Sequence, residues 1–294
     1  MVRQIVTALL VVTVSACSRT EIVYRNADRF LSYYARQTVD ASDIQRERWQ
    51  PVMERVLRHH REEELPLVLA YLDLAGHIVG NSDASPGAAC LVDGAGHLYR
   101  RHAQLAVDLA APLLADLDGD QISHLAEYSE ERQEKAIKRY LDPDPRSRKA
   151  SRQARFIERI EDWTGRLSGD QRAQIRNAVE RIPDLSAPWL AYRAQQTNRL
   201  LSMIEAGADE STLREYLDHW WVDMGAQSAE YREKWHVARQ EIVRLLDELA
   251  TTLTDRQRER VTNRLGDLRR DLASFLYAPQ APADLSAVPA CEAA

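Results

Sequence analysis

Several residue types that mark particular folds and functions are scarce in this chain of 294 residues. Glycine occurs 11 times and Phe three times, which leaves few of the turn residues that a fold rich in strands needs. An excess of positive charge is also missing, because 39 basic residues stand against 45 acidic ones and the net charge is −6. The chain therefore lacks the basic surplus that drives counterion release from nucleic acids, and we expect no nucleic-acid partner.

The N-terminus lacks an apolar run of membrane-spanning length. The run from Ile5 to Val14 is shorter than the ~20 residues that a spanning helix needs. It follows Arg3 and precedes the small residues Ser15 and Ala16. A positive charge, a short apolar core and small residues before a cleavage site are typical of a secretory signal peptide, which we predict over residues 1–16.

The cleavage region, Val14-Ser15-Ala16-Cys17, resembles the bacterial lipobox. The resemblance implies that the sulfur of Cys17 takes a diacylglycerol, that the chain is cut before it, and that the new amine receives a fatty acid such as palmitate. A thiolate is the nucleophile suited to this chemistry, and several acyl chains give stable anchoring in a lipid bilayer. Ser18, rather than Asp, follows the cysteine, which implies an outer-membrane lipoprotein facing the periplasm. The alternative is an ordinary cleaved signal peptide in which this Cys occurs by chance.

Two further cysteines, Cys90 and Cys291, stand in the mature chain. The periplasm is oxidising and permits a disulfide. However, Cys291 lies in an Ala/Pro-rich tail, residues 278–294, that we predict to be disordered. Whether the two cysteines pair is left open.

The rest of the chain carries the apolar spacing of helices rather than the alternation of strands. Examples are the series Val23, Ala27, Phe30, Tyr34; Leu190, Ala194, Thr197, Leu201, Ile204; Trp235, Ala238, Ile242, Leu245, Leu249; and Val261, Leu265, Leu268, Leu272, Phe275. Each series places an apolar stripe on one side of a helix. We predict one all-α domain over residues 17–277, folded as an antiparallel multi-helix bundle with short connections.

Prolines and glycines predict where the helices break. Pro66 should kink or divide the segment 44–78, because proline lacks the amide hydrogen and clashes with the preceding turn. The stretch 76–96 holds several turn residues and is predicted to be the least helical one. Pro143 and Pro183 should follow the ends of two further helices.

One local motif recurs four times, as an apolar residue, then Ser, Thr or Asp, then two residues, then Gln. Its copies are residues 41–45, 117–121, 167–171 and 253–257. We interpret it as a capping box, in which the first polar side chain and the Gln satisfy backbone amides at the start of a helix. The motif is also similar to the L-T-x-x-Q motifs of Spy-type periplasmic chaperones, which bind unfolded clients on a concave helical surface.

A broader resemblance covers the chain from Cys17 to about Leu276. The order of its motifs resembles an uncharacterised family of helical lipoproteins from Gram-negative bacteria, a domain of unknown function. The resemblance implies a helical fold and an envelope location, and it carries over no catalytic residue. The motifs are Tyr24-Arg25-Asn26-Ala27-Asp28, His60-Arg61, Glu64-Leu65-Pro66, Trp189-Leu190-Ala191-Tyr192-Arg193, Leu213-Arg214-Glu215-Tyr216-Leu217 and Trp220-Trp221.

Histidines and carboxylates raise the alternatives of a metal site and an enzyme. His59 and Glu63, like His60 and Glu64, are four residues apart, and we interpret both as surface ion pairs on a helix. A third ligand at zinc spacing is not visible, so we predict no metal and no cofactor. A serine-nucleophile motif and a phosphate-binding glycine loop are also missing. We predict a non-catalytic protein; the alternative is an envelope hydrolase whose site is assembled from distant Glu, Asp and His residues.

Aromatic residues gather in the C-terminal half, around the adjacent Trp220 and Trp221. Neighbouring residues on a helix cannot both face one core line. Either both are buried between helices, or one of them faces a groove or a partner. We therefore predict an acyl-anchored binding, scaffolding or chaperone-like module with an apolar groove for a protein client or an envelope partner.

Overall fold

The computed structural model describes residues 24, 26–81 and 87–276. These residues form helices joined by short connections, and no strand occurs among them. The predicted all-α multi-helix fold is therefore confirmed. The predicted signal peptide, the predicted lipid-attachment site at Cys17 and the predicted C-terminal tail lie outside the described residues.

The helices follow one another in this order. The first half of the chain forms α3 (Ala27–Val39), α4 (Asp43–His59), the π-helical turn η1 (His60–Glu64), α5 (Leu65–Gly80), α6 (Ala88–Ala115) and α7 (Gly119–Tyr140). The second half forms α8 (Pro145–Thr164), α9 (Gly169–Arg181), α10 (Ser186–Glu205), α11 (Glu210–Leu217), the π-helical turn η2 (Asp218–Val222), α12 (Ala229–Thr252) and α13 (Asp255–Ala273).

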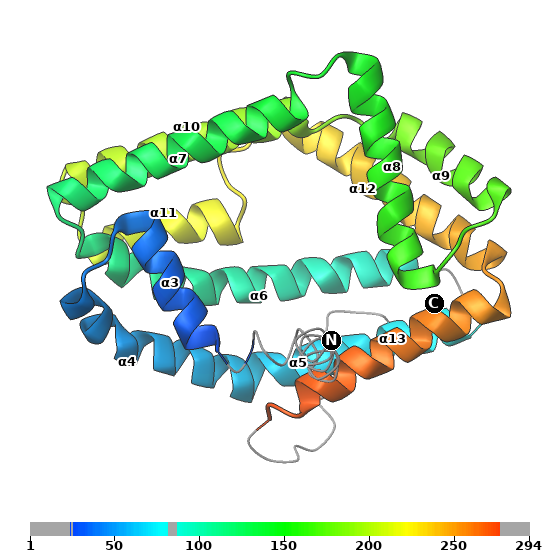
Figure 1. The fold of residues 1–294 in the computed structure, drawn as a ribbon, viewed down its shortest axis with the longest axis horizontal. Helices are drawn as coiled ribbons and strands as arrows, with labels where there is room; N and C mark the ends of the chain where they lie inside the picture. Colours follow the sequence, from blue (N-terminus) through cyan, green and yellow to red (C-terminus); the bar gives the residue numbers. More distant parts are fainter. Residues whose placement is uncertain (1–23, 25, 82–86, 277–294) are drawn as a thin grey trace, which may run out of the picture.

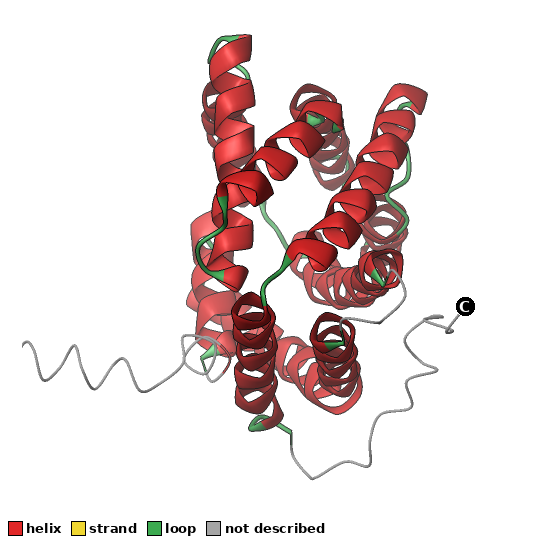
Figure 2. Cartoon of the chain, turned by 90° about the vertical axis from the view of Figure 1, so that its right-hand side faces the viewer, coloured by secondary structure: helices red, strands yellow, loops and turns green. Residues whose placement is uncertain are grey.

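These helices trace an elongated outline (Figure 1). Helices α4, α5 and α13 run along one long side, α7 and α10 run along the other, and α8, α9 and α12 lie at one end. Helix α6 runs lengthwise between the two long sides. The end view shows the helices as distinct rods joined by short loops (Figure 2).

Buried apolar side chains form several separate clusters rather than one central core. The largest cluster joins α6 to α10, α11 and η2 through residues such as Val107, Leu200 and Leu213. Other clusters lie between α8, α9 and α12, between α5 and α13, and around Trp49 of α4. Helical domains usually bury one contiguous core, whereas the buried residues described here fall into four clusters, two of which are linked by the partly buried Leu125.

Pro66 divides the segment as predicted, and the structure shows how. Pro66 stands in the first turn of α5, directly after η1, and the wider turn is closed by the amide of Leu65, which donates to the carbonyl of His60. A proline is accepted in the first turn of a helix because its missing amide hydrogen would have no partner there.

The prediction that residues 76–96 are the least helical stretch is wrong for most of that range. Residues 76–80 belong to α5 and residues 88–96 to α6. Helix α6 begins where the amide of Ala88 donates to Asp247 Oδ1 of α12 at 3.2 Å. Gly94 is buried in α6, so tertiary packing outweighs the low helix propensity of glycine here.

All four predicted capping boxes are present. Ser42, Asp118, Ser168 and Thr254 each accept a hydrogen bond from the backbone of the Gln three residues later, and each Gln side chain accepts one from the backbone of its cap residue. The boxes start α4, α7, α9 and α13, which confirms the interpretation of the motif as a helix start.

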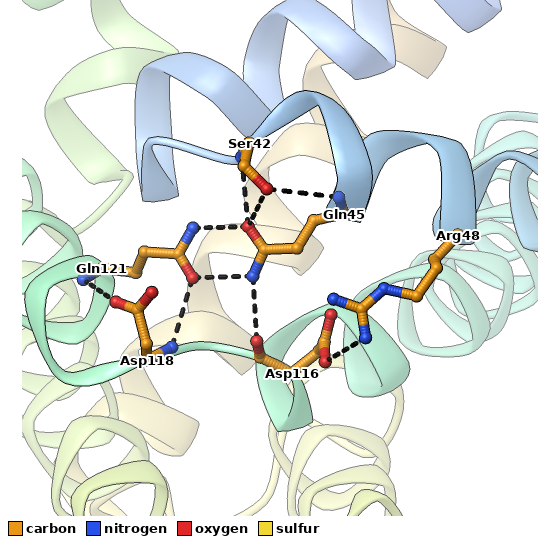
Figure 3. Close-up of polar contacts among 6 residues, drawn as sticks. All are labelled: Ser42, Gln45, Arg48, Asp116, Asp118 and Gln121. Carbon is orange, nitrogen blue, oxygen red and sulfur yellow. Dashed lines mark hydrogen bonds and ion pairs between the residues drawn. The ribbon is translucent and has the colours of Figure 1, made fainter.

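The sequence did not indicate that the four glutamines bind one another in pairs. The side chains of Gln45 and Gln121 donate to each other at 2.8 and 2.7 Å (Figure 3). Gln45 also donates to the carbonyl of Asp116, and Gln121 donates to the carbonyl of Asp40. Each of these carbonyls lies two residues before the cap residue of the other helix. Gln171 and Gln257 repeat this arrangement. We call the two junctions glutamine corners, the α4/α7 corner and the α9/α13 corner. They lie toward opposite ends of the long axis (Figure 1).

Candidate functional site

Both π-helical turns of the described residues pack against α6. In η1 the amide of Leu65 reaches the carbonyl of His60, and in η2 the amide of Asp223 reaches the carbonyl of Asp218 at 3.1 Å. Such wide turns are rare and are found frequently at functional sites, because they shift side chains away from the regular helical spacing. The two turns therefore direct attention to the surface of α6 between them.

An apolar groove of about 450 Å³ lies beside η2. It is formed by α6, by η2 with the turn that follows, and by α10. We call it the aromatic groove, and its lining consists of Tyr99, His102, Ala103, Ala106, Trp189, Arg193, Trp220, Trp221 and Met224. An apolar lining with a few polar groups is typical of a binding site.

The adjacent tryptophans of η2 have different roles. Trp220 is 9% exposed and belongs to the largest core cluster, where its ring centroid lies 6.1 Å from that of Tyr216. Trp221 is only partly buried and packs against that cluster from the side, with 5.9 Å between the two indole centroids. Of the two alternatives left open above, the structure supports the second: Trp220 serves mainly the core, and Trp221 faces the groove.

The turn after η2 is held in place at one wall of the groove. A Cβ on Gly225 would lie 2.1 Å from Cε1 of His219, so any other residue here would force that ring to move. Tyr192 donates a 2.7 Å hydrogen bond to the carbonyl of Gly225, and burial raises the pKa of Tyr192 to about 12. Met224, whose φ is +53°, directly precedes this anchor and is itself part of the groove lining. The wall is thus built on fixed backbone rather than on a loose loop.

A buried ion pair joins α6 to the other π-helical turn, η1. Glu64 is 2% exposed, and Arg101 of α6 donates to its two oxygens at 2.6 and 2.7 Å. Burial alone would raise the pKa of Glu64, but the hydrogen bonds and charge of Arg101 outweigh it and lower this pKa overall. His59 Nε2 lies 3.6 Å from Glu64 Oε1. Glu64 is therefore an ionised, fully engaged carboxylate.

His60 and His102 form a chain of hydrogen bonds that begins at Tyr24. Nδ1 of His102 lies 2.7 Å from the carbonyl of Leu98, and because a carbonyl only accepts, this nitrogen carries the proton. With its proton on Nδ1, His102 accepts at Nε2 from His60 Nε2 at 3.2 Å, and Nδ1 of His60 accepts from the hydroxyl of Tyr24 at 2.8 Å. The pKa of His60 is lowered to about 4, mainly by burial and secondly by the charge of the nearby His102. His102 also lines the aromatic groove, so it links this network to the groove.

The interpretation of His59/Glu63 and His60/Glu64 as surface ion pairs is wrong. Within η1 the spacing between stacked residues becomes five, so His59 approaches Glu64, while His60 turns to Tyr24 and His102. The carboxylate is also buried rather than on the surface. The Pro66 signal was visible in the sequence, but nothing local indicated that the break would take the form of a π-helical turn.

Among the described residues, no group of three or more His, Cys, Asp or Glu side chains is placed to hold a metal ion. In the same part of the chain, no helix is both long enough and apolar enough to cross a membrane. Cys90 is disulfide-bonded, and the other two cysteines of the chain, Cys17 and Cys291, lie outside the described residues. Lipid attachment at Cys17 and the absence of a metal or cofactor stay predictions.

Residues 37–221 match the model of a family of unknown function, DUF6279. The matched range includes η1, α6, the two tryptophans of η2 and all groove residues except Met224. It is narrower than the predicted range from Cys17 to about Leu276. No curated protein and no solved structure matches the chain.

Proposed function

The chain belongs to the family of unknown function DUF6279, and we propose that it is a non-catalytic binding module that holds an apolar segment of a protein client in the aromatic groove. The observation that carries the proposal is the groove itself, with three indole rings and Tyr99 around an apolar space on α6. Tryptophan and tyrosine dominate binding energy at protein contact sites because they combine a large apolar area with few rotatable bonds.

The openness of the lining supports a protein client rather than a small molecule. Tyr99 is 51% exposed although it lines the groove. A site for a small ligand usually buries 70–90% of the ligand surface, whereas a half-open groove suits a large side chain that projects from a bigger partner. The guanidinium group of Arg193 lies among the apolar side chains, where it is able to donate hydrogen bonds to the backbone carbonyls of such a segment.

The division of the apolar core also supports this proposal. Separate clusters hold the helices in an extended arrangement, and an extended arrangement exposes more surface to a client than a compact bundle does. The four capping boxes are similar to those of Spy-type periplasmic chaperones, which supports a chaperone-like version of the proposal. The glutamine corners would keep such a surface open and rigid.

The chemistry of the histidine network favours binding over the hydrolase alternative. Glu64 is the buried carboxylate of the network, and Arg101 occupies both of its oxygens. With a pKa of about 4, His60 is a weak general base at neutral pH. A hydrolase would need a carboxylate or imidazole that is free to take a proton from water.

The proposal further places the module in the bacterial envelope, anchored in the outer membrane by acyl chains on Cys17 and facing the periplasm. Mass spectrometry of the N-terminus of the protein purified from membranes tests this part. We expect a first residue Cys17 that carries a diacylglycerol on sulfur and a fatty acid on the amine. A mature chain that starts elsewhere, or a free thiol at Cys17, would contradict the anchor and leave the groove proposal standing.

Substitution of Trp221 tests the groove. The purified protein is mixed with a chemically unfolded, aggregating client, and light scattering is followed as the ratio of protein to client increases. We expect suppression of aggregation by the unchanged protein, and a loss of affinity of about tenfold or more in Trp221→Ala, because truncation of a central tryptophan typically costs ~2 kcal/mol or more of binding energy.

Trp235→Ala is the matched control. Trp235 of α12 is 49% exposed and does not line the groove, so its loss should leave the suppression unchanged. Aggregation that proceeds equally with and without a stoichiometric excess of the unchanged protein would overturn the proposal. Equal activity of the Trp221 and Trp235 variants would place the binding surface elsewhere.

A further inference from the structure

The two glutamine corners share one backbone arrangement but carry opposite charge. The pocket at the α4/α7 corner, about 770 Å³, is acidic. Its basic lining residues are Arg48 and His124, and its acidic ones are Asp40, Asp116, Asp118, Asp120 and Glu127. The pocket at the α9/α13 corner, about 880 Å³, is basic. Its acidic lining residues are Glu259 and Asp267, and its basic ones are Arg166, Arg256, Arg260 and Arg264. Two helix starts meet at each corner, so the helix dipoles are alike and the side chains make the difference.

The side chains of three of the four arginines at the basic corner form no hydrogen bond and no ion pair with the described residues. They are Arg166, Arg256 and Arg260, whereas Arg264 donates to the carbonyl of Asp162 and lies over the ring of Trp163, with 5.0 Å to the centroid. Elsewhere in the chain many arginines are paired, as Arg101 is with Glu64 and Arg181 with Glu241. These three exposed guanidinium groups carry like charge around one pocket, and an anion bound between them would relieve their screened repulsion.

The backbone of the corner makes room for one of these side chains. Gly165 has a φ of +77°, and a Cβ on it would lie 3.2 Å from Cδ and 3.3 Å from Nε of Arg260. The glycine therefore allows the Arg260 side chain to lie close across the loop between α8 and α9. The N-termini of α9 and α13, which the caps Ser168 and Thr254 begin, add positive potential to the same pocket.

We propose that the basic corner binds a phosphate-bearing anion. The planar guanidinium group forms paired hydrogen bonds to phosphate oxygens, and several such groups around one pocket favour a ligand with concentrated negative charge. The net charge of the whole chain is −6, so a general attraction of anions is not expected, and binding should be confined to this corner. The site is separate from the aromatic groove, and its failure or success leaves the client proposal untouched.

The test measures binding of two probes to the full-length protein, because soluble ions and lipid headgroups both carry such a phosphate. Inorganic pyrophosphate is titrated by calorimetry, and vesicles of phosphatidylcholine with and without phosphatidylglycerol are tested by co-sedimentation. We expect saturable binding to pyrophosphate, to the phosphatidylglycerol vesicles, or to both, weakening as NaCl rises. Pyrophosphate binding alone identifies a free phosphate anion, and vesicle binding alone identifies a lipid headgroup.

The variant Arg166→Gln/Arg256→Gln/Arg260→Gln should lower the affinity by about tenfold or more, because each lost guanidinium removes a charge-assisted hydrogen bond. The matched control, Arg55→Gln/Arg58→Gln/Arg159→Gln, removes the same charge from exposed arginines outside the pocket and should bind as the unchanged protein does. All six residues are exposed, so both variants should keep the thermal unfolding temperature. If neither probe binds, or if the two variants weaken binding equally, the proposal is overturned.

Discussion

The residues that set the character of the candidate site are His60, His102 and Glu64, and each has a partner on another element. Glu64 is held by Arg101, and His60 is held between Tyr24 and His102. These contacts join η1 to α6 and connect the first described residue of the chain to the groove. Breaking one member of such a network leaves its buried partners unsatisfied.

The pH dependence of stability is a prediction at this scale. The pKa of His60 is about 4 in the folded chain and ~6.5 when unfolded. The folded state thus binds this proton less readily, so the contribution of His60 to stability is fully present above the unfolded pKa and is lost as the pH falls toward 4. After a discount for its partial exposure, this contribution amounts to roughly 2–3 kcal/mol.

Urea denaturation of the unchanged protein and of His60→Gln at pH 7.5 and pH 4.5 measures this effect. The unchanged protein should lose more free energy of unfolding between the two pH values than the variant does. His236→Gln, at an exposed histidine of α12, is the control and should keep the full pH dependence. Identical losses in the unchanged protein and in His60→Gln would show that His60 is not the titrating group.

At the residue scale, sequence reasoning identified the right residue types but not their partners. His60 and Glu64 were paired with each other on the assumption of regular helical spacing, whereas η1 shifts the spacing and sends them to His102 and Arg101. Both true partners are about 40 residues away in the chain, on α6. A spacing argument within one segment has no access to such contacts.

At the scale of the elements, the glutamine corners join helices that are far apart in the chain. Within each corner both amide hydrogens and the carbonyl oxygen of every Gln are used, and all four side chains are buried. A buried amide with every group satisfied stabilises one arrangement of its helices, because any shift of a helix leaves several polar groups unpaired.

A double-mutant cycle at the α9/α13 corner tests this account. Gln171→Leu removes the partner of Gln257 and of the carbonyl of Thr252, so it should lower the free energy of unfolding by about 2–3 kcal/mol. Gln257→Leu should cost about as much, and the double variant should cost clearly less than the sum of the two. As a control, Gln240→Leu at an exposed position should change the free energy of unfolding by about 0.5 kcal/mol or less. Strict additivity would contradict the paired arrangement.

The starts and breaks of the elements were largely predictable, because their signals are local. The four capping boxes, the break at Pro66 and the helix ends before Pro143 and Pro183 all follow from side chains within a few residues. The pairing of the boxes was not predictable, since the glutamines of a pair are 76 or 86 residues apart and nothing near them selects one partner over another. The helicity of residues 88–96 was missed because packing overrides glycine there.

At the scale of the whole molecule, the arrangement of helices around an elongated outline was beyond the sequence. Periodic apolar stripes predict that each helix packs against other helices. They do not determine whether the helices share one central core or form several small ones. The described residues form several clusters, and α6 contacts η1, η2 and the aromatic groove. This arrangement is what turns a set of ordinary amphipathic helices into a candidate surface for a client.

Hydrogen–deuterium exchange of the full-length protein, with and without a permanently unfolded model client, tests the client proposal most directly. The account predicts slower exchange on client addition in η2, in the turn at residues 223–228 and in α6 around Tyr99 to Ala106, while α9 on the far side of the molecule keeps its exchange rates. Protection that is spread evenly over the helices, or absent at η2 and α6 under saturating client, would contradict the account.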